Sequence, residues 1–156
     1  MKVTIENYTS MALRTWGGEN QRERAEWGVI GEFGEVAEVY KKFLRGDFDE
    51  EEKNKRILKE LGDSTYYYAI SLYLEDKDIS KVKDSGDYEM VINPSNMIFC
   101  VHNYIQYNYG DGELMELIQS ICTDCGFTIE QVMQANIEKL ADRAKRNKIS
   151  GDGDER

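Results

Sequence analysis

The chain has 156 residues, and its 30 acidic and 20 basic side chains give a formal net charge of −10. This balance argues against a protein that binds nucleic acid or anionic membranes through a broad basic surface. The sequence has no apolar run of bilayer length and its start, MKVTIENYTS, is polar, so we expect a single domain over residues 1–156 in a cytoplasmic protein without membrane or nucleic-acid partners.

Helical spacing of apolar residues is frequent, and proline occurs once, at Pro94. The second helix, for example, carries an apolar stripe with +4, +3, +4, +3 spacing at Val29, Phe33, Val36, Tyr40 and Phe43. Glycines, Pro94 and capping residues delimit the predicted helices, which cover 6–16, 21–44, 50–74, 96–109, 113–125 and 128–147. We expect a loop over 76–93, with weak β character in YEMVI, and a polar tail over 148–156.

Short turns between long amphipathic helices favour an all-α fold, an antiparallel helical bundle. The three cysteines are an odd number without a secretory signal, which argues against a disulfide framework. Cys122 and Cys125 form a lone CxxC pair, and Cys100 with His102 would be needed to complete a zinc site. Because one pair with irregular partners is a weak metal signal, we expect these cysteines to fill the core.

Two pairs of acidic residues stand three residues apart on neighbouring predicted helices. Glu32 and Glu35 share a face of the second helix, and Glu60 and Asp63 share a face of the third. Each pair lies about ten residues from the turn at 45–49, so an antiparallel hairpin brings both pairs to a similar height. The sequence therefore predicts that four carboxylates converge.

Such a cluster needs a counter-ion, because like charges about 4–5 Å apart repel by a few kcal/mol at an effective dielectric near 20. Mg²⁺ or Mn²⁺ would remove that cost, since both are hard cations that prefer oxygen ligands. The alternative is a solvated acidic face, which is common in an acidic protein. The carboxylates border the apolar stripes, however, and this position favours a site over a free surface.

Three glycines in the second helix, Gly28, Gly31 and Gly34, also need an explanation. Each costs up to about 1 kcal/mol relative to alanine in a helix interior. The usual compensation is the close approach of another backbone. We therefore expect tight packing on this side of the helix, with Glu32 and Glu35 at a contact or cleft.

The last predicted helix carries a polar and cationic stripe, Asn136, Lys139 and Arg143, beside an apolar one. A lysine and an arginine one turn apart next to a core face suit phosphate oxygens. Ordinary surface charge near a helix C-terminus explains the same pattern equally well.

Taken together, these motifs resemble the MazG-like nucleoside triphosphate pyrophosphohydrolases of the all-α pyrophosphatase superfamily. The family pattern is ExxE, a spacer and ExxD, which here reads GEFGEVAEVYKK and KELGDSTYY with residues 36–59 between the two motifs. The resemblance continues in YTSMALRTW and ANIEKLADR and covers most of the chain. One departure is AKRNKI, where the family often has an aromatic residue soon after KLxxR.

The resemblance implies hydrolysis of a (deoxy)nucleoside triphosphate to the monophosphate and pyrophosphate in a homodimer or homotetramer. It implies Mg²⁺, or Mn²⁺, held by Glu32, Glu35, Glu60 and Asp63, with Glu32 or Glu35 activating the attacking water. It also implies substrate contacts from Arg14, Arg56, Asn136, Lys139 and Arg143.

Three other classes remain as alternatives. An all-α dUTPase or dCTP pyrophosphatase would share the metal chemistry and differ in the base pocket. A ferritin-like di-iron protein needs Glu-x-x-His pairs, but the single histidine, His102, follows Phe99 at that spacing. A non-catalytic acidic helical interaction protein would release no pyrophosphate.

Overall fold

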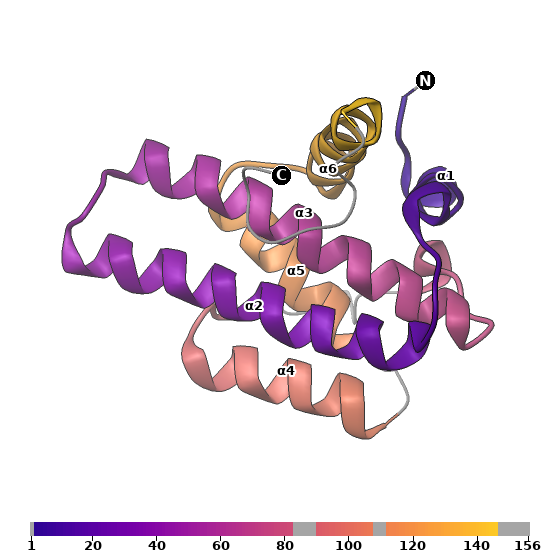
Figure 1. Ribbon diagram of the computed structural model, residues 1–156. Coiled ribbons are helices and arrows are strands. Elements are labelled where there is room, and N and C mark those ends of the chain that lie inside the picture. Colours follow the sequence, from indigo (N-terminus) through magenta and orange to yellow (C-terminus); the bar gives the residue numbers. More distant parts are fainter. Residues whose placement is uncertain (1, 83–89, 108–111, 147–156) are drawn as a thin grey trace.

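The computed structural model describes residues 2–82, 90–107 and 112–146. Within these residues the chain is all-helical and contains no strand (Figure 1). The α-helices are α1 (Ile5–Ala12), α2 (Gln21–Arg45), α3 (Glu50–Leu74), α4 (Pro94–Gln106), α5 (Glu113–Asp124) and α6 (Ile129–Lys145). Two short 3-10 segments are η1 (Leu13–Thr15) and η2 (Ile79–Lys81). The all-α prediction is confirmed, and the described part of YEMVI, residues 90–92, forms no strand.

Local signals in the sequence account for most helix boundaries. Gly46 ends α2 in the left-handed region, with φ +86°, which glycine adopts without strain. Asp49 then caps α3 by accepting a hydrogen bond from the Glu52 amide at 2.9 Å. The predicted capping box of Thr128 and Gln131 is present at the start of α6. The first helix is shorter than predicted, because the chain tightens into η1 after Ala12. The predicted polar tail, 148–156, lies outside the described residues.

The hairpin of α2 and α3 runs through the centre of the fold as two antiparallel helices lying side by side (Figure 1). Its facing stripes meet in the core, as the periodicity predicts. Val29, Phe33 and Val36 of α2 and Leu61, Tyr68 and Leu72 of α3 are all buried. Burial of apolar side chains of this size contributes about 1.5–3 kcal/mol each, so this seam fixes the relative height of the two helices.

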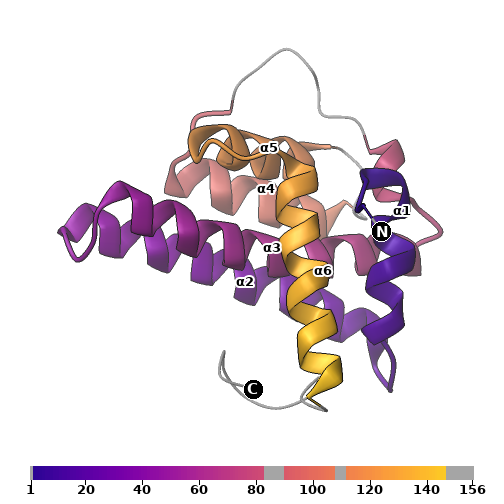
Figure 2. The same cartoon turned by 90° about the horizontal axis from the view of Figure 1, so that it is seen from above.

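The sixth helix departs from the simple bundle that the sequence predicts. Figure 2 shows α6 running across α3 instead of along it, close to α1. The helix α4 lies along α2 on the side away from α3 (Figure 1). None of the helices in the described part of the chain combines the length and apolar character needed to cross a membrane.

Candidate metal centre

Three carboxylates meet where α6 crosses the α2–α3 hairpin. One oxygen each from Glu32 on α2 and from Glu60 and Asp63 on α3 lie within 4.8 Å of one another. All three side chains are partly buried. The predicted convergence of the two acidic motifs is thus confirmed for these three residues.

The fourth predicted carboxylate, Glu35, lies outside this group and is exposed. The prediction that all four converge is wrong in this respect. With 3.6 residues per turn, side chains three residues apart differ by about 60° around the helix axis. Glu32 therefore faces α3, whereas Glu35 turns toward solvent. Its charge still adds to the raised pKa of Glu32, as the weakest of the contributing groups.

The position of Glu32 in the cluster raises the pKa of its carboxyl group. Burial, and after it the neighbouring charges of Asp63 and Glu60, together raise the pKa of Glu32 to about 7, while Lys139 opposes the shift. A carboxyl group with this pKa carries its proton for much of the time near neutral pH. The positive charges of the protein alone therefore do not fully compensate the negative charge of the three carboxylates.

Asp63 is held by two side chains of α6. The amide nitrogen Nδ2 of Asn136 donates a hydrogen bond to Oδ1 of Asp63 at 2.9 Å. The ammonium of Lys139 forms an ion pair with the other oxygen, Oδ2. Both partners of that ion pair are largely buried, with side-chain exposures of 19% for Lys139 and 15% for Asp63. The two contacts fix the orientation of the carboxylate.

Tyr8 of α1 was not predicted as part of the site. It is fully buried, and its hydroxyl donates a hydrogen bond to Oδ1 of Asn136 at 3.0 Å. Burial and the Asp63 charge raise the pKa of Tyr8 well above its usual value, so the hydroxyl keeps its proton and remains a donor. This hydrogen bond directs Nδ2 of Asn136 toward Asp63, so Asn136 supports a carboxylate of the cluster.

Glycines set how closely the elements of the site approach. A Cβ atom at Gly62 would lie 3.2 Å from Cβ of Asn136, and one at Gly28 would lie 2.3 Å from the ring of Tyr67. Gly62 thus permits the close crossing of α3 and α6 that brings Asn136 to Asp63. The predicted tight packing is confirmed at Gly28 and wrong at Gly31 and Gly34, where an added Cβ meets nothing within 4 Å among the described residues.

The predicted substrate cations differ in their positions. Lys139 contacts the cluster, and Arg143 is buried one turn further along α6. Arg56 is directed elsewhere: its Nε bonds Glu52 at 2.7 Å, and its guanidinium lies over the ring of Phe48 at 4.6 Å. Arg14 is exposed in η1. The contact of Lys139 with Asp63 therefore places one of the predicted cations at the carboxylates.

An aromatic cluster follows Asp63 by one turn of α3. The rings of Trp16, Tyr66 and Tyr67 pack edge to face, with centroid separations of 5.3–6.1 Å. Nε1 of Trp16 is buried and has no hydrogen-bond partner among the described residues. The guanidinium of Arg24 covers the Trp16 ring at 4.7 Å. One signal for this cluster is visible in the sequence, the run of three tyrosines that begins three residues after Asp63.

The cysteines behave as the core-filling interpretation predicts. Cys100, Cys122 and Cys125 are free and buried, and Sγ of Cys100 lies 3.3 Å from the sulfur of Met90. Burial raises the pKa of the Cys122 thiol to about 12, which makes the thiolate scarce. In the described part of the chain, the cysteines and His102 do not gather into a group that could share a metal ion.

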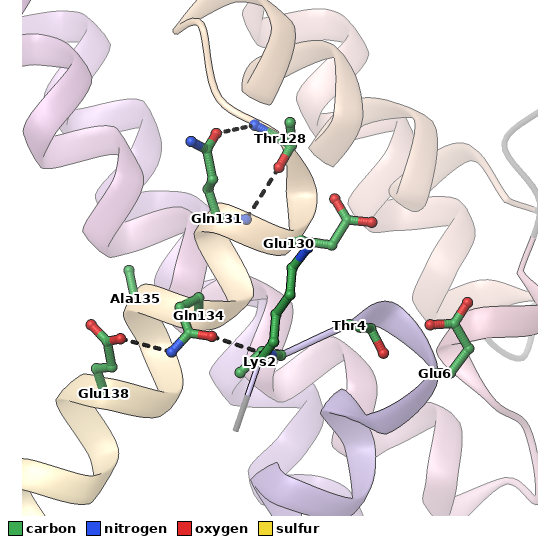
Figure 3. Close-up of a pocket in the computed structure, with 10 residues that line it drawn as sticks. Lys2, Thr4, Glu6, Thr128, Glu130, Gln131, Gln134, Ala135 and Glu138 are labelled. Carbon is green, nitrogen blue, oxygen red and sulfur yellow. Dashed lines mark hydrogen bonds between the residues drawn. The ribbon is translucent and has the colours of Figure 1, made fainter.

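A hollow lies on another face of α6, between that helix and the N-terminal segment (Figure 3). Its volume is about 640 Å³, and acidic side chains outnumber basic ones on its wall, with Glu6, Glu130 and Glu138 against Lys2. Gln134, in the same hollow, accepts a hydrogen bond from the Val3 amide at 2.9 Å. In the described part of the chain these acidic side chains do not gather into a group that could share a metal ion, so the carboxylate cluster is the better candidate for a metal centre.

Comparisons with models of known protein families, with curated proteins and with solved structures found no match.

Proposed function

We propose that this chain is a Mg²⁺-dependent nucleoside triphosphate pyrophosphohydrolase. The observation that carries the proposal is the meeting of Glu32, Glu60 and Asp63 beside Lys139. These carboxylates come from the two acidic motifs on which the resemblance to the MazG-like enzymes rests. The cation comes from a third element, α6, on the predicted phosphate-binding stripe.

The donor set fits a hard divalent cation. Its three ligands are carboxylate oxygens, which hard cations prefer. Opposite ligands of a magnesium ion lie about 4.2 Å apart at metal–oxygen distances of about 2.1 Å, so oxygens within 4.8 Å of one another need only small side-chain adjustments. Magnesium bound here would neutralise phosphate charge and lower the pKa of a bound water. We favour Mg²⁺ over Mn²⁺ because Mg²⁺ commonly binds through a few carboxylates plus substrate phosphates.

The chain's own side chains would supply the metal ligands, the general base and the phosphate contacts. Glu32, Glu60 and Asp63 serve as ligands, which leaves the exposed Glu35 to orient the attacking water and accept its proton. Water attacks the α-phosphorus, the bond to the bridging α–β oxygen breaks, and pyrophosphate leaves. Lys139 and Arg143 contact the leaving phosphates. The products are the nucleoside monophosphate and pyrophosphate.

The aromatic cluster supports the nucleotide part of the proposal. Trp16 and Tyr66 lie next to the turn of α3 that carries Asp63, so a base held there would remain close to its own phosphates. The buried Nε1 of Trp16 has no partner among the described residues, and it would donate to a base carbonyl if a bound base opened this cluster. The preferred base distinguishes a general pyrophosphohydrolase from the all-α dUTPase or dCTP pyrophosphatase alternative.

A panel of ribo- and deoxynucleoside triphosphates tests the proposal. In the presence of Mg²⁺ we expect release of pyrophosphate and the monophosphate, and we expect EDTA to stop the reaction. Turnover confined to dUTP or dCTP would favour the alternative enzyme class. Release of orthophosphate would contradict cleavage between the α and β phosphates, and absence of any release would favour the non-catalytic interaction protein.

We also propose that two copies associate through an apolar groove between α2 and α4. The groove has a volume of about 370 Å³, and Gly34 lies on its wall with open space around it. Ile98 on the α4 side is 70% exposed and Ile30 on the α2 side is 40% exposed. A second helix packed there would explain both the exposed apolar side chains and the uncompensated glycine.

Sedimentation velocity checks this association. We expect a dimer or tetramer for the natural chain and a shift toward the monomer for Ile98→Glu, because a charge in an apolar interface has no partner. The matched control is Lys41→Glu, at an exposed position of α2 away from the groove wall, which should leave the assembly unchanged. A natural chain that sediments as a monomer at all concentrations would contradict the interface.

A further inference from the structure

We propose that Lys139 is the internal counter-ion of the metal-free carboxylate cluster, and that a divalent cation displaces its ammonium from Asp63 and so frees it for phosphate. This inference rests on the proposed function, because it concerns the same site. It goes beyond that function because Lys139 becomes available to a substrate phosphate only when a metal ion occupies the site.

The carboxylate cluster carries a high local negative charge. Three carboxylates lie within 4.8 Å of one another, and the ammonium of Lys139 pairs directly with one of them. A second lysine, Lys59, lies near Glu60 at a longer distance of 3.8 Å, and its side chain is 38% exposed. Lys139 is more buried, at 19%, so water screens its charge less. Of these two ion pairs, that of Lys139 therefore compensates the cluster more strongly without metal.

Hydrogen bonds fix the orientation of Asp63. Its Oδ1 accepts the hydrogen bond from Asn136, which Tyr8 holds in place from the opposite end of the amide. The carboxylate cannot rotate to present a different oxygen without breaking this chain of hydrogen bonds. A cation that binds Asp63 through Oδ2 competes with the ammonium of Lys139 for that oxygen. Two positive charges on one oxygen repel each other, so binding of metal expels the ammonium.

The side chain of Lys139 is flexible enough for its displaced ammonium to remain near the cluster. A lysine ammonium sits on a flexible four-carbon stem with rotatable bonds. Lys139 also stands one turn before Arg143 on α6. Once displaced, the ammonium stays beside the cluster and next to a second cation. Metal and nucleotide then bind with positive coupling. The metal releases Lys139 from Asp63, and the nucleotide supplies a phosphate partner for the released ammonium.

Titration of the full chain with Mn²⁺ alone, without nucleotide, tests the inference. Electron paramagnetic resonance of free Mn²⁺ gives the dissociation constant directly. We expect Lys139→Met and Lys139→Gln each to tighten Mn²⁺ binding at least about fivefold, because the competing charge is gone. Lys139→Arg keeps the charge and should remain within about twofold of the natural chain. Binding of a non-hydrolysable nucleotide in saturating Mn²⁺ should weaken in the Met and Gln variants.

Two controls separate displacement from general electrostatics. Lys145→Met removes an exposed lysine from the same helix and should leave Mn²⁺ affinity unchanged. Lys59→Met removes the more distant neighbour of Glu60 and should tighten binding less than Lys139→Met does. Equal tightening at positions 59 and 139, or unchanged or weaker binding in folded Lys139→Met and Lys139→Gln, would overturn the inference.

The outcomes also separate this inference from the proposed function. If the natural chain binds no Mn²⁺ at the cluster, both fail together. If the Lys139 variants tighten Mn²⁺ binding and no nucleotide is cleaved, displacement stands and the pyrophosphohydrolase proposal fails. If nucleotides are cleaved while the Lys139 variants bind Mn²⁺ no more tightly, the proposed function stands and displacement fails.

Discussion

Asp63→Asn should lower Mg²⁺-dependent pyrophosphate release by about a thousandfold or more. The asparagine side chain keeps the size of aspartate and loses the charge that pairs with Lys139 and that would hold the metal in its place. Loss of a metal ligand removes several kcal/mol of transition-state stabilisation, and about 1.4 kcal/mol corresponds to a tenfold change in rate. Initial rates at saturating nucleotide measure the effect, and circular dichroism confirms that the variant is folded.

Asp142→Asn is the matched control for this variant. Asp142 is exposed on the same helix as Lys139 and pairs with Arg146 at 2.7 Å. An exposed pair of this kind contributes little to stability, so we expect a rate within about twofold of the natural chain. An Asp63→Asn protein that retains full activity would place the catalytic metal elsewhere.

Glu32→Gln should stabilise the metal-free protein at pH 8 and remove its response to Mg²⁺. In the folded chain, burial and the nearby Asp63 and Glu60 charges raise the pKa of Glu32 to about 7, from an ordinary value of 4.5. Between these two values the folded state binds more protons than the unfolded state. The free energy of unfolding therefore falls as the pH rises from 4.5 through 7. Glutamine carries no charge and avoids this loss.

The shift of Glu32 corresponds to roughly 3 kcal/mol at most, and the partial exposure of the side chain reduces it to about 1–3 kcal/mol. For a chain of this size we expect a melting temperature about 3–10 °C higher in EDTA at pH 8, and little difference at pH 4.5. Addition of 10 mM Mg²⁺ should raise the melting temperature of the natural chain and leave that of Glu32→Gln unchanged.

Glu51→Gln provides the comparison for Glu32→Gln. Glu51 is exposed on α3 and pairs with Lys55 at 2.7 Å, so its loss should change stability by less than about 0.5 kcal/mol in either direction. A Glu32→Gln protein that melts at a lower temperature than the natural chain in EDTA at pH 8 would show that Glu32 stabilises the fold, as a structural residue does.

The helices and the acidic cluster could be predicted because both depend on local signals. The stripe at Val29, Phe33 and Val36 identified the buried face of α2. Residue counting from the turn at 45–49 brought the acidic pair of α2 level with the acidic pair of α3. A hairpin of two long helices leaves little freedom in its register once both apolar faces are buried.

The departures from prediction arise where contacts join distant parts of the chain. Tyr8 reaches Asn136 across 128 positions of sequence, and this contact requires α1 and α6 to pack together. The crossing of α6 over α3 depends on the close approach at Gly62. The direction of Glu35 depends on how far α2 is rotated about its own axis. The spacing of an ExxE motif leaves this rotation undetermined by about 100°, the angle between successive residues. Periodicity alone cannot supply these three facts.

The measurement that tests the central claim most directly is anomalous diffraction from a crystal of the full chain soaked in Mn²⁺. The metal site that we propose predicts a peak bonded to Glu32, Glu60 and Asp63 at roughly 2.2 Å, with the ammonium of Lys139 moved away from Asp63. A peak at the acidic hollow beside Glu6 and Glu138, or no peak at the three carboxylates at saturating Mn²⁺, would contradict it.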